Sequence, residues 1–152
     1  MLLPVQGGVG EYPPQISPDG NWVAYWSNES GRSEVYVRPF PDINKGQWLI
    51  SSGGGNCPLW SPDGRELFYR NEESVIAVPF ETGLDFKLGT PQALFWKYNA
   101  LASDDKPYLP IWDISPDGKR FLMAKPSQSL HRIHLVANWR ELIRDSKFEI
   151  RD

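Results

Sequence analysis

Three copies of one tetrapeptide decide the fold: Ser17-Pro18-Asp19-Gly20, Ser61-Pro62-Asp63-Gly64 and Ser115-Pro116-Asp117-Gly118. In each copy the proline presets the backbone for the first central position of a tight turn, and the aspartate suits the second position. The glycine accepts the left-handed conformation that follows. Such a turn joins two antiparallel strands as a bulged hairpin. We therefore predict that a strand ends at each serine and that another strand begins just after each glycine.

The residues after the turns support this prediction, because Trp22–Trp26, Glu66–Tyr69 and Arg120–Ala124 are short, nearly continuous apolar runs. A strand that is buried on both faces has such a sequence. Further strands are expected at 34–38, 75–78 and 133–136 as third strands, and at 47–50 and 92–95 as fourth strands. The pattern predicts one four-stranded antiparallel meander that is repeated along the chain.

The spacing of the turns indicates the architecture. The copies recur about 44 and about 54 residues apart, and one blade of a β-propeller takes about 40–50 residues. The longer interval contains an additional polar stretch, residues 97–110, which is expected to be an inserted loop. We therefore predict an all-β fold, a β-propeller with three four-stranded blades in a single domain, 1–152. The blades are expected at about 13–50, 57–96 and 108–138.

Both ends of the chain extend this pattern. Residues 2–6, followed by two glycines, have the same sequence pattern as the segment at 48–52 that leads into the second blade. We predict that 2–6 forms an outer blade strand, which the third blade lacks. Residues 139–152 are expected to form a C-terminal cap with a short helix at its start. Residues 147–151 alternate like a strand and compete with 2–6 for the outer position of the third blade.

The residues ISPDGNWVAY at 16–25 and EVYV at 34–37 resemble the repeat of TolB-like, WD-repeat-type propellers. They are also similar to the propeller tails of certain bacterial serine/threonine kinases, and the closing LVANW at 135–139 resembles the end of such tails. The resemblance covers nearly the whole chain, and it implies a six-bladed propeller that binds proteins or small ligands. The sequence has no kinase signature, so kinase activity is not implied.

Three blades do not close a propeller, because closed propellers have about 4–8 blades. A half-ring would leave two uncovered faces and an unpaired strand edge. Two copies would complete a six-bladed ring, and twofold dimers are the commonest oligomers. We therefore expect a homodimer in which residues 2–6 of each chain complete the third blade of the other chain. The alternative is a fragment of a larger propeller.

The composition excludes several classes of partner. With 16 Lys and Arg against 19 Asp and Glu, the net charge of −3 gives no basic surface for nucleic acid or for an anionic membrane. No apolar run reaches the roughly 20 residues of a membrane span, so we expect no membrane insertion. The start of the chain, Met1–Val5, lacks the features of a signal peptide. The expected compartment is cytoplasmic, or periplasmic if the chain is cut from a longer precursor.

Residues that could suggest chemistry have simpler structural explanations. Turn formation accounts for the three aspartates, Asp19, Asp63 and Asp117. His131 and His134 lie three residues apart on a predicted strand, so they point to opposite faces and do not converge on a metal. Ser33 lacks the final glycine of a nucleophile elbow, and no helix follows the glycines at 53–55 to bind phosphate. We therefore expect no cofactor and no metal.

The predicted ligand-binding site is one mouth of the central channel, where the loops that cross from blade to blade converge. Six residues are candidates for this site: Glu11, Tyr12, Asn56, Cys57, Tyr108 and Trp112. The predicted function is a non-catalytic module for protein–protein interaction or assembly that completes itself as a homodimer. The alternative is a small-ligand or metal-dependent propeller enzyme or sensor that uses the central channel. That alternative needs clustered polar side chains, and only Glu11 and Asn56 provide them at the predicted mouth.

Overall fold

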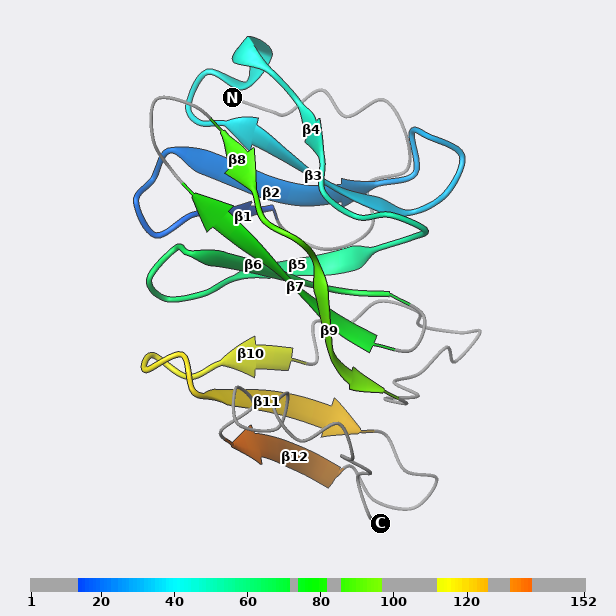
Figure 1. The fold of residues 1–152 in the computed structure, drawn as a ribbon, viewed down its shortest axis with the longest axis vertical. Helices are drawn as coiled ribbons and strands as arrows, with labels where there is room; N and C mark the ends of the chain where they lie inside the picture. The colour runs from blue at the N-terminus through cyan, green and yellow to red at the C-terminus, as the bar shows by residue number, and fades with distance from the viewer. Residues whose placement is uncertain (1–13, 72–73, 82–85, 97–111, 126–131, 138–152) are drawn as a thin grey trace.

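The computed structural model describes residues 14–71, 74–81, 86–96, 112–125 and 132–137. In this part of the chain the strands form three antiparallel sheets that follow one another along the longest axis of the molecule (Figure 1). The predicted all-β fold is confirmed. The predicted outer strand at 2–6, the inserted loop at 97–110 and the C-terminal cap at 139–152 lie outside the described residues.

The first sheet is the four-stranded meander that the sequence predicts. Its strands are β1 (Gln15–Ile16), β2 (Trp22–Ser27), β3 (Glu34–Pro39) and β4 (Trp48–Leu49), and each pairs with the next in this order. A short 3-10 helix, η1 (Ile43–Lys45), lies in the connection from β3 to β4. Its buried residue is Ile43.

The second sheet has one strand more than predicted. It consists of β5 (Asn56–Trp60), β6 (Glu66–Arg70), β7 (Ser74–Glu81), β8 (Lys87–Leu88) and β9 (Gln92–Trp96). Both β8 and β9 pair with β7, β8 at its end and β9 at its start. The predicted fourth strand therefore exists as β9, and β8 precedes it on the same edge. Pro91 lies between them and has no N–H to continue the ladder.

The third sheet has three strands among the described residues: β10 (Trp112–Ile114), β11 (Arg120–Lys125) and β12 (Arg132–Ala137). They pair in this order, and the register of β11 with β12 runs without a break from Arg120↔Ala137 to Lys125↔Arg132. These strands match the predicted positions.

The three Ser-Pro-Asp-Gly turns have the same hydrogen bonds. In the second turn, Ser61 Oγ donates to Asp63 Oδ1 (2.7 Å) and accepts from the N–H of Glu66 (2.9 Å). The serines of the first and third turns make the same two bonds. Each glycine has a positive φ, between 67° and 76°. The predicted turn chemistry is therefore confirmed in every copy, and each serine hydroxyl links the end of one strand to the start of the next.

The pKa values of two turn carboxylates, Asp117 and Asp19, are lowered. Hydrogen bonds from Ser115 and Lys119 lower the pKa of Asp117. Burial acts to raise the pKa of Asp19, but hydrogen bonds from Ser17 and Asn21 outweigh it, and the pKa is lowered. A carboxyl whose pKa is lower in the folded state stabilises the fold above its ordinary pKa. It loses this contribution as the pH falls through the lowered value.

Aromatic rings fill the space between the first two sheets. Trp22 of β2 contacts Phe80 of β7 edge to face, with ring centroids 5.7 Å apart, and Trp48 of β4 stacks on Phe86 at 4.4 Å. Trp60 of β5 contacts Phe80, and its indole N–H donates to the backbone carbonyl of Gln15 in β1 (3.0 Å). Offset and edge-to-face ring pairs add to the free energy gained from burying the rings.

A smaller aromatic group joins the second sheet to the third. Phe68 of β6 meets Phe121 of β11 edge to face at 5.0 Å, and Trp112 of β10 stacks on Phe121. Phe68 and Phe121 are fully buried. Aromatic rings therefore hold each sheet to the next.

We expect Ser61→Ala to lower the free energy of unfolding by about 1–3 kcal/mol, because it leaves the N–H of Glu66 without its acceptor, the buried hydroxyl of Ser61. The measurement is chemical denaturation followed by circular dichroism. Ser52→Ala is the matched control, since Ser52 is exposed. Equal stability of the two variants would contradict the role of the serine hydroxyl.

Candidate functional site

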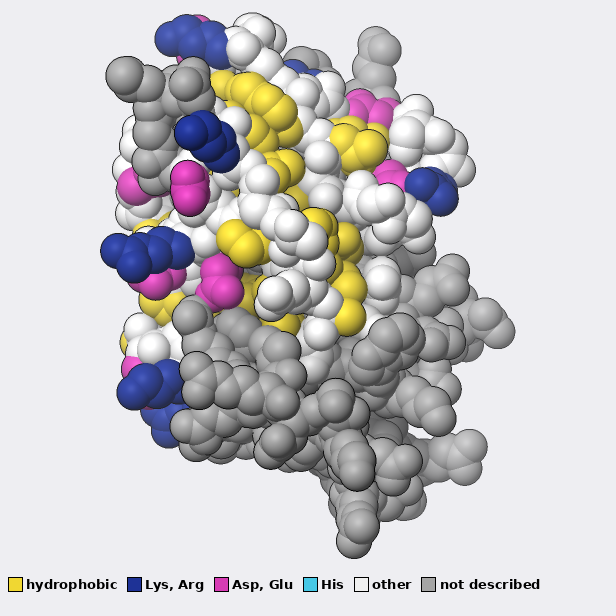
Figure 2. Space-filling model, viewed as in Figure 1, with side chains coloured by type: hydrophobic (Ala, Val, Ile, Leu, Met, Phe, Trp, Pro, Cys, Tyr) yellow, Lys and Arg dark blue, Asp and Glu magenta, His cyan; other side chains and the backbone are white. Residues whose placement is uncertain are grey.

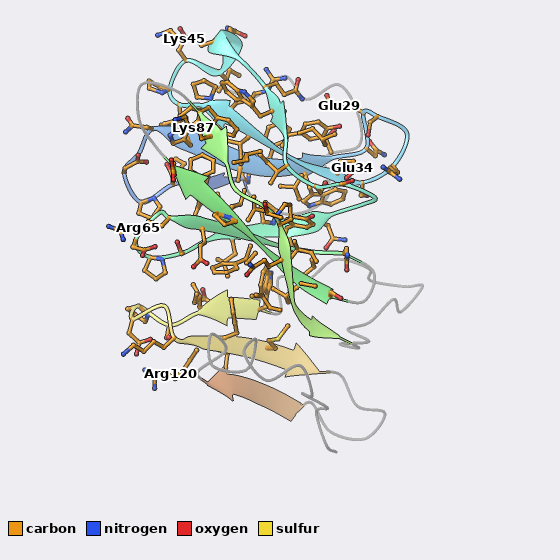
Figure 3. All side chains as sticks on the ribbon, in the orientation of Figure 1. Glu29, Glu34, Lys45, Arg65, Lys87 and Arg120 are labelled. Carbon is orange, nitrogen blue, oxygen red and sulfur yellow. The ribbon has the colours of Figure 1, made fainter. Side chains whose placement is uncertain are left out.

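The connections between strands gather at two opposite edges of the sheets, and these two edges differ chemically (Figure 1). The Ser-Pro-Asp-Gly turns lie together at one end, which we call the turn end. The connection from β4 to β5, residues 50–55, lies at the other end, which we call the crossover end. Figure 3 shows Arg65 and Arg120 at the turn end, and Glu29 and Glu34 at the crossover end.

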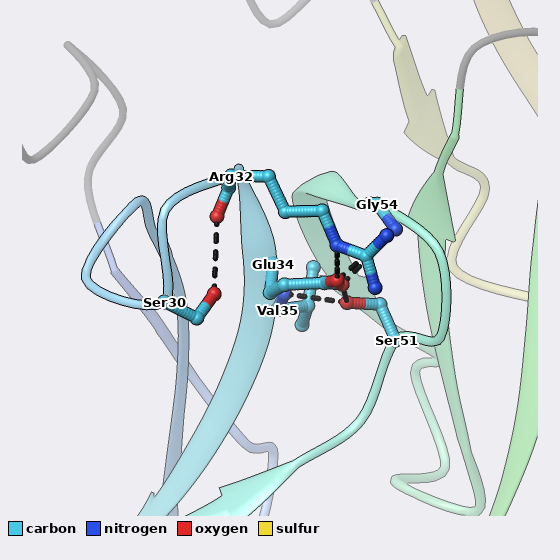
Figure 4. A network of polar contacts seen from close by, with 6 residues as sticks. All are labelled: Ser30, Arg32, Glu34, Val35, Ser51 and Gly54. Carbon is cyan, nitrogen blue, oxygen red and sulfur yellow. Dashed lines mark hydrogen bonds and ion pairs between the residues drawn. The ribbon is translucent and has the colours of Figure 1, made fainter.

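A buried carboxylate organises the crossover end (Figure 4). Glu34, at the start of β3, accepts a hydrogen bond from Ser51 Oγ and from the N–H of Gly54, and it pairs with Arg32 Nε. The carboxylate is almost completely buried, whereas Arg32 is mostly exposed. Ser51 Oγ also accepts from the N–H of Val35 (2.8 Å). The network therefore ties the start of β3 to the loop that enters the second sheet.

The crossover loop requires a glycine where it passes closest to the second sheet. A Cβ atom at Gly55 would lie 2.7 Å from the Cβ of Ser51 and 3.0 Å from the ring of Tyr69. The backbone of Gly55 also donates to the carbonyl of Ser33 (2.8 Å). Burial raises the pKa of Tyr69, and the charge of Glu34 acts in the same direction. Tyr69 is therefore a neutral phenol beside a packed loop.

The structure places two of the predicted site residues together at the crossover end. Asn56 and Cys57 are adjacent at the start of β5, where Asn56 is half-buried and Cys57 is buried. Burial raises the pKa of the Cys57 thiol to about 11, although the charge of Arg70 acts in the opposite direction. The thiol is therefore protonated at neutral pH, and nucleophilic chemistry by Cys57 is not supported.

The other predicted site residues divide into two groups. Trp112 is buried against Phe121 between the second and third sheets, so its ring packs in the core. Three residues lie outside the described part of the chain: Glu11, Tyr12 and Tyr108. Ligand binding at the six predicted positions stays a prediction.

A groove that the sequence analysis missed lies at the turn end. It has a volume of about 430 Å³ and lies between the second and third turns, lined by Ser61–Asp63 and Pro116–Lys119. Acidic and basic side chains alternate along this edge of the molecule (Figure 2). In this groove Asp117 pairs with Arg120 at 3.1 Å. The tetrapeptides themselves carry the signal for the groove, because equivalent turns of neighbouring blades are neighbours in space.

Apolar side chains are exposed on both outward faces of the row of sheets. The first end face is the side of the first sheet that points away from the second sheet. Trp22, Ala24 and Trp26 of β2 pack toward the second sheet. The side chains that alternate with them in β2, and their partners in β1, point to the opposite side and form this face. On this face Ile16 is 51% exposed and Leu49 is 53% exposed, whereas Val23 and Tyr25 of β2 are buried.

Tyrosine rings and a cation lie between these apolar side chains. Tyr25 stacks on Tyr36 with ring centroids 5.7 Å apart. The Tyr25 hydroxyl accepts from Arg38 Nε (2.8 Å) and from Gln47 Nε2 (3.1 Å). Burial raises the pKa of Tyr25, so its hydroxyl is neutral at physiological pH. The face therefore combines exposed aliphatic side chains with a fixed polar network.

The second end face is the side of the third sheet that points away from the second sheet. Phe121 and Met123 of β11 pack toward the second sheet and are buried, whereas Leu122 between them is 46% exposed. The described residues include four exposed large hydrophobic side chains, Ile16, Leu49, Leu88 and Leu122. Three of the four, Ile16, Leu49 and Leu122, lie on the two end faces.

This architecture is similar to that of known solved structures. TolB from Acinetobacter baumannii matches 86% of this chain with a TM-score of 0.57 and 18% sequence identity. A TolB-type protein from Agrobacterium tumefaciens matches 84% of the chain with a TM-score of 0.52 and 16% identity. The fold is of the β-propeller type. The chain spans 30% of the length of the first structure and 47% of the second. No family model and no curated protein matches the sequence.

Among the described residues, no helix is long and apolar enough to cross a membrane. Within the same ranges, no three His, Cys, Asp or Glu side chains lie together in a way that could hold a metal ion.

We expect Cys57 to react slowly with a thiol reagent such as dithionitrobenzoate at pH 8 in the folded protein, because the thiol is buried and protonated. In guanidinium chloride the same thiol should react at the rate of a free cysteine. A fast reaction of the folded chain would contradict the buried position.

We expect Glu34→Ala to lower the free energy of unfolding by roughly 2–4 kcal/mol, because the hydroxyl of Ser51 and the N–H of Gly54 lose a buried acceptor. Glu34→Gln keeps an acceptor and should cost less. Urea denaturation measures both variants, with Glu81→Gln as the exposed control. If Glu34→Ala matched the control, the carboxylate would not organise the crossover.

Proposed function

We propose that this chain is a non-catalytic protein-interaction module that assembles with a second copy of itself through its two end faces. The observation that carries the proposal is the position of Ile16, Leu49 and Leu122. They expose apolar surface at opposite ends of the row of sheets, where each inner sheet face in the same chain is covered by its neighbour. Burying such surface removes apolar area from water, which is the main driving force for association.

The number of sheets favours two copies. Closed propellers have about 4–8 blades, so copies with three sheets each reach this range only as a pair. The two TolB-type structures are longer than this chain. In each of them the part that matches this chain is less than half of the protein, 30% in one and 47% in the other. The three sheets therefore correspond to part of each TolB-type protein.

The mass in solution tests this proposal. Light scattering behind size exclusion should give about 35 kDa, twice the 17.4 kDa of the chain. Leu122→Asp should shift the mass to that of one chain, because a carboxylate would be buried in the joint. Leu88→Asp is the matched control, since Leu88 is also exposed but pairs with Phe80 at the edge between the first two sheets. A single-chain mass for the unsubstituted protein would contradict the proposal.

A further inference from the structure

The turns give a register for how one sheet docks on the next. The position where a Cβ of Gly64 would lie is 3.6 Å from Cδ of Pro18, in the turn before it. The corresponding position at Gly118 is 3.7 Å from Cδ of Pro62. At both joints the proline of one turn therefore packs on the glycine of the following turn.

The first turn has the same glycine without this contact. At Gly20 nothing lies within 4 Å of the equivalent position, although its turn has the same hydrogen bonds and a similar φ of 76°. At the other end of the row, Pro116 is the third proline of the series, and no further turn of this kind follows it. Among the described residues, the glycine of the first turn and the proline of the third turn are therefore the two that lack this contact.

The strands that follow the turns pack in the same register. Phe68 lies four residues after the turn glycine of the second sheet, and it packs on Phe121, three residues after the glycine of the third sheet. Leu122 is the repeat equivalent of Phe68, and it is exposed. The equivalent of Phe121 in the first sheet is Val23, which is buried and is the register partner of the exposed Ile16. Leu122 and Ile16 thus expose positions whose equivalents in the second sheet, Phe68 and Trp60, are buried at the internal joints.

We propose that two copies dock head to tail, with Pro116 of one copy packed on Gly20 of the other and Leu122 beside Ile16. This inference rests on the proposed self-association, and it adds the register. The joint continues the two internal joints, so the first sheet of one copy follows the third sheet of the other. Such a contact uses different surfaces on the two copies, and it closes when the rotation returns to the start. In a pair, the joint forms twice.

Cysteine pairs at the turns test the register. The double variant Asn21→Cys with Pro116→Cys places thiols on the residue after the first turn glycine and on the third proline, and both positions are exposed. A short bismaleimide should join them between chains and give a covalent dimer on a denaturing gel. The matched control is Pro62→Cys with Lys119→Cys, the equivalent pair at an internal joint. The control also replaces a turn proline, and its two cysteines should be joined within one chain. The protein should therefore keep the mass of a single chain on the gel.

The single variants distinguish other arrangements. Neither Asn21→Cys alone nor Pro116→Cys alone should cross-link, whereas a mixture of the two should give the covalent dimer after exchange of chains. The buried Cys57 is present in every variant, and the unsubstituted protein measures its contribution.

Three results would overturn the register. Cross-linking of Pro116→Cys alone would mean that two third sheets face each other. A ladder of covalent species larger than a dimer would mean that the contact does not close. A mass of about 35 kDa, twice the 17.4 kDa chain, without cross-linking of the double variant would mean that the copies associate elsewhere. In these cases the proposed self-association stands and the register fails, whereas a single-chain mass would overturn both.

Discussion

The hydrogen bonds of one hydroxyl group set the geometry on which the rest of the structure depends. In each turn the serine Oγ accepts from the N–H that opens the following strand and donates to the turn aspartate. This fixes where the first strand of a sheet ends and in which register the second returns. Since a slip of one residue would exchange the two faces of a strand, the turn also determines which side chains meet the neighbouring sheet.

The turns set the strand register, and the register determines which side chains pack between neighbouring sheets. Along β2, β6 and β11, successive side chains point to opposite faces of the sheet. One set points toward the next sheet along the row, and the other set points in the opposite direction. Rings occupy both sets wherever a neighbour exists, as in the pairs of Trp22 with Phe80 and of Phe68 with Phe121. The turns then stack as a consequence, because sheets with equal turns in equal register bring their prolines and glycines together. Local hydrogen bonding and packing between sheets therefore specify the same arrangement.

The repeat made most of the fold predictable, and the features without a repeat were not predictable. Three equal tetrapeptides at blade spacing were enough to predict the hairpins and the order of the strands. The division of the outer edge into β8 and β9 was not expected, because it depends on Pro91 interrupting a ladder. The buried Glu34 network also escaped prediction, since Glu34 reads in the sequence as a polar residue at the start of a strand. Its partners Ser51 and Gly54 are distant in the sequence and meet it only in the folded chain.

The same repeat explains why the exposed residues of this chain are informative. An exposed leucine alone has little meaning, because much of any protein surface is apolar. Leu122, however, occupies a position whose equivalent in the second sheet, Phe68, is fully buried against the next sheet. Ile16 likewise occupies the position of Trp60, which is buried against the preceding sheet and donates to its backbone. At the two ends of the row, Leu122 and Ile16 therefore expose positions that are buried at the joints inside the chain, and the proposed joint between two chains needs no contact of a new kind.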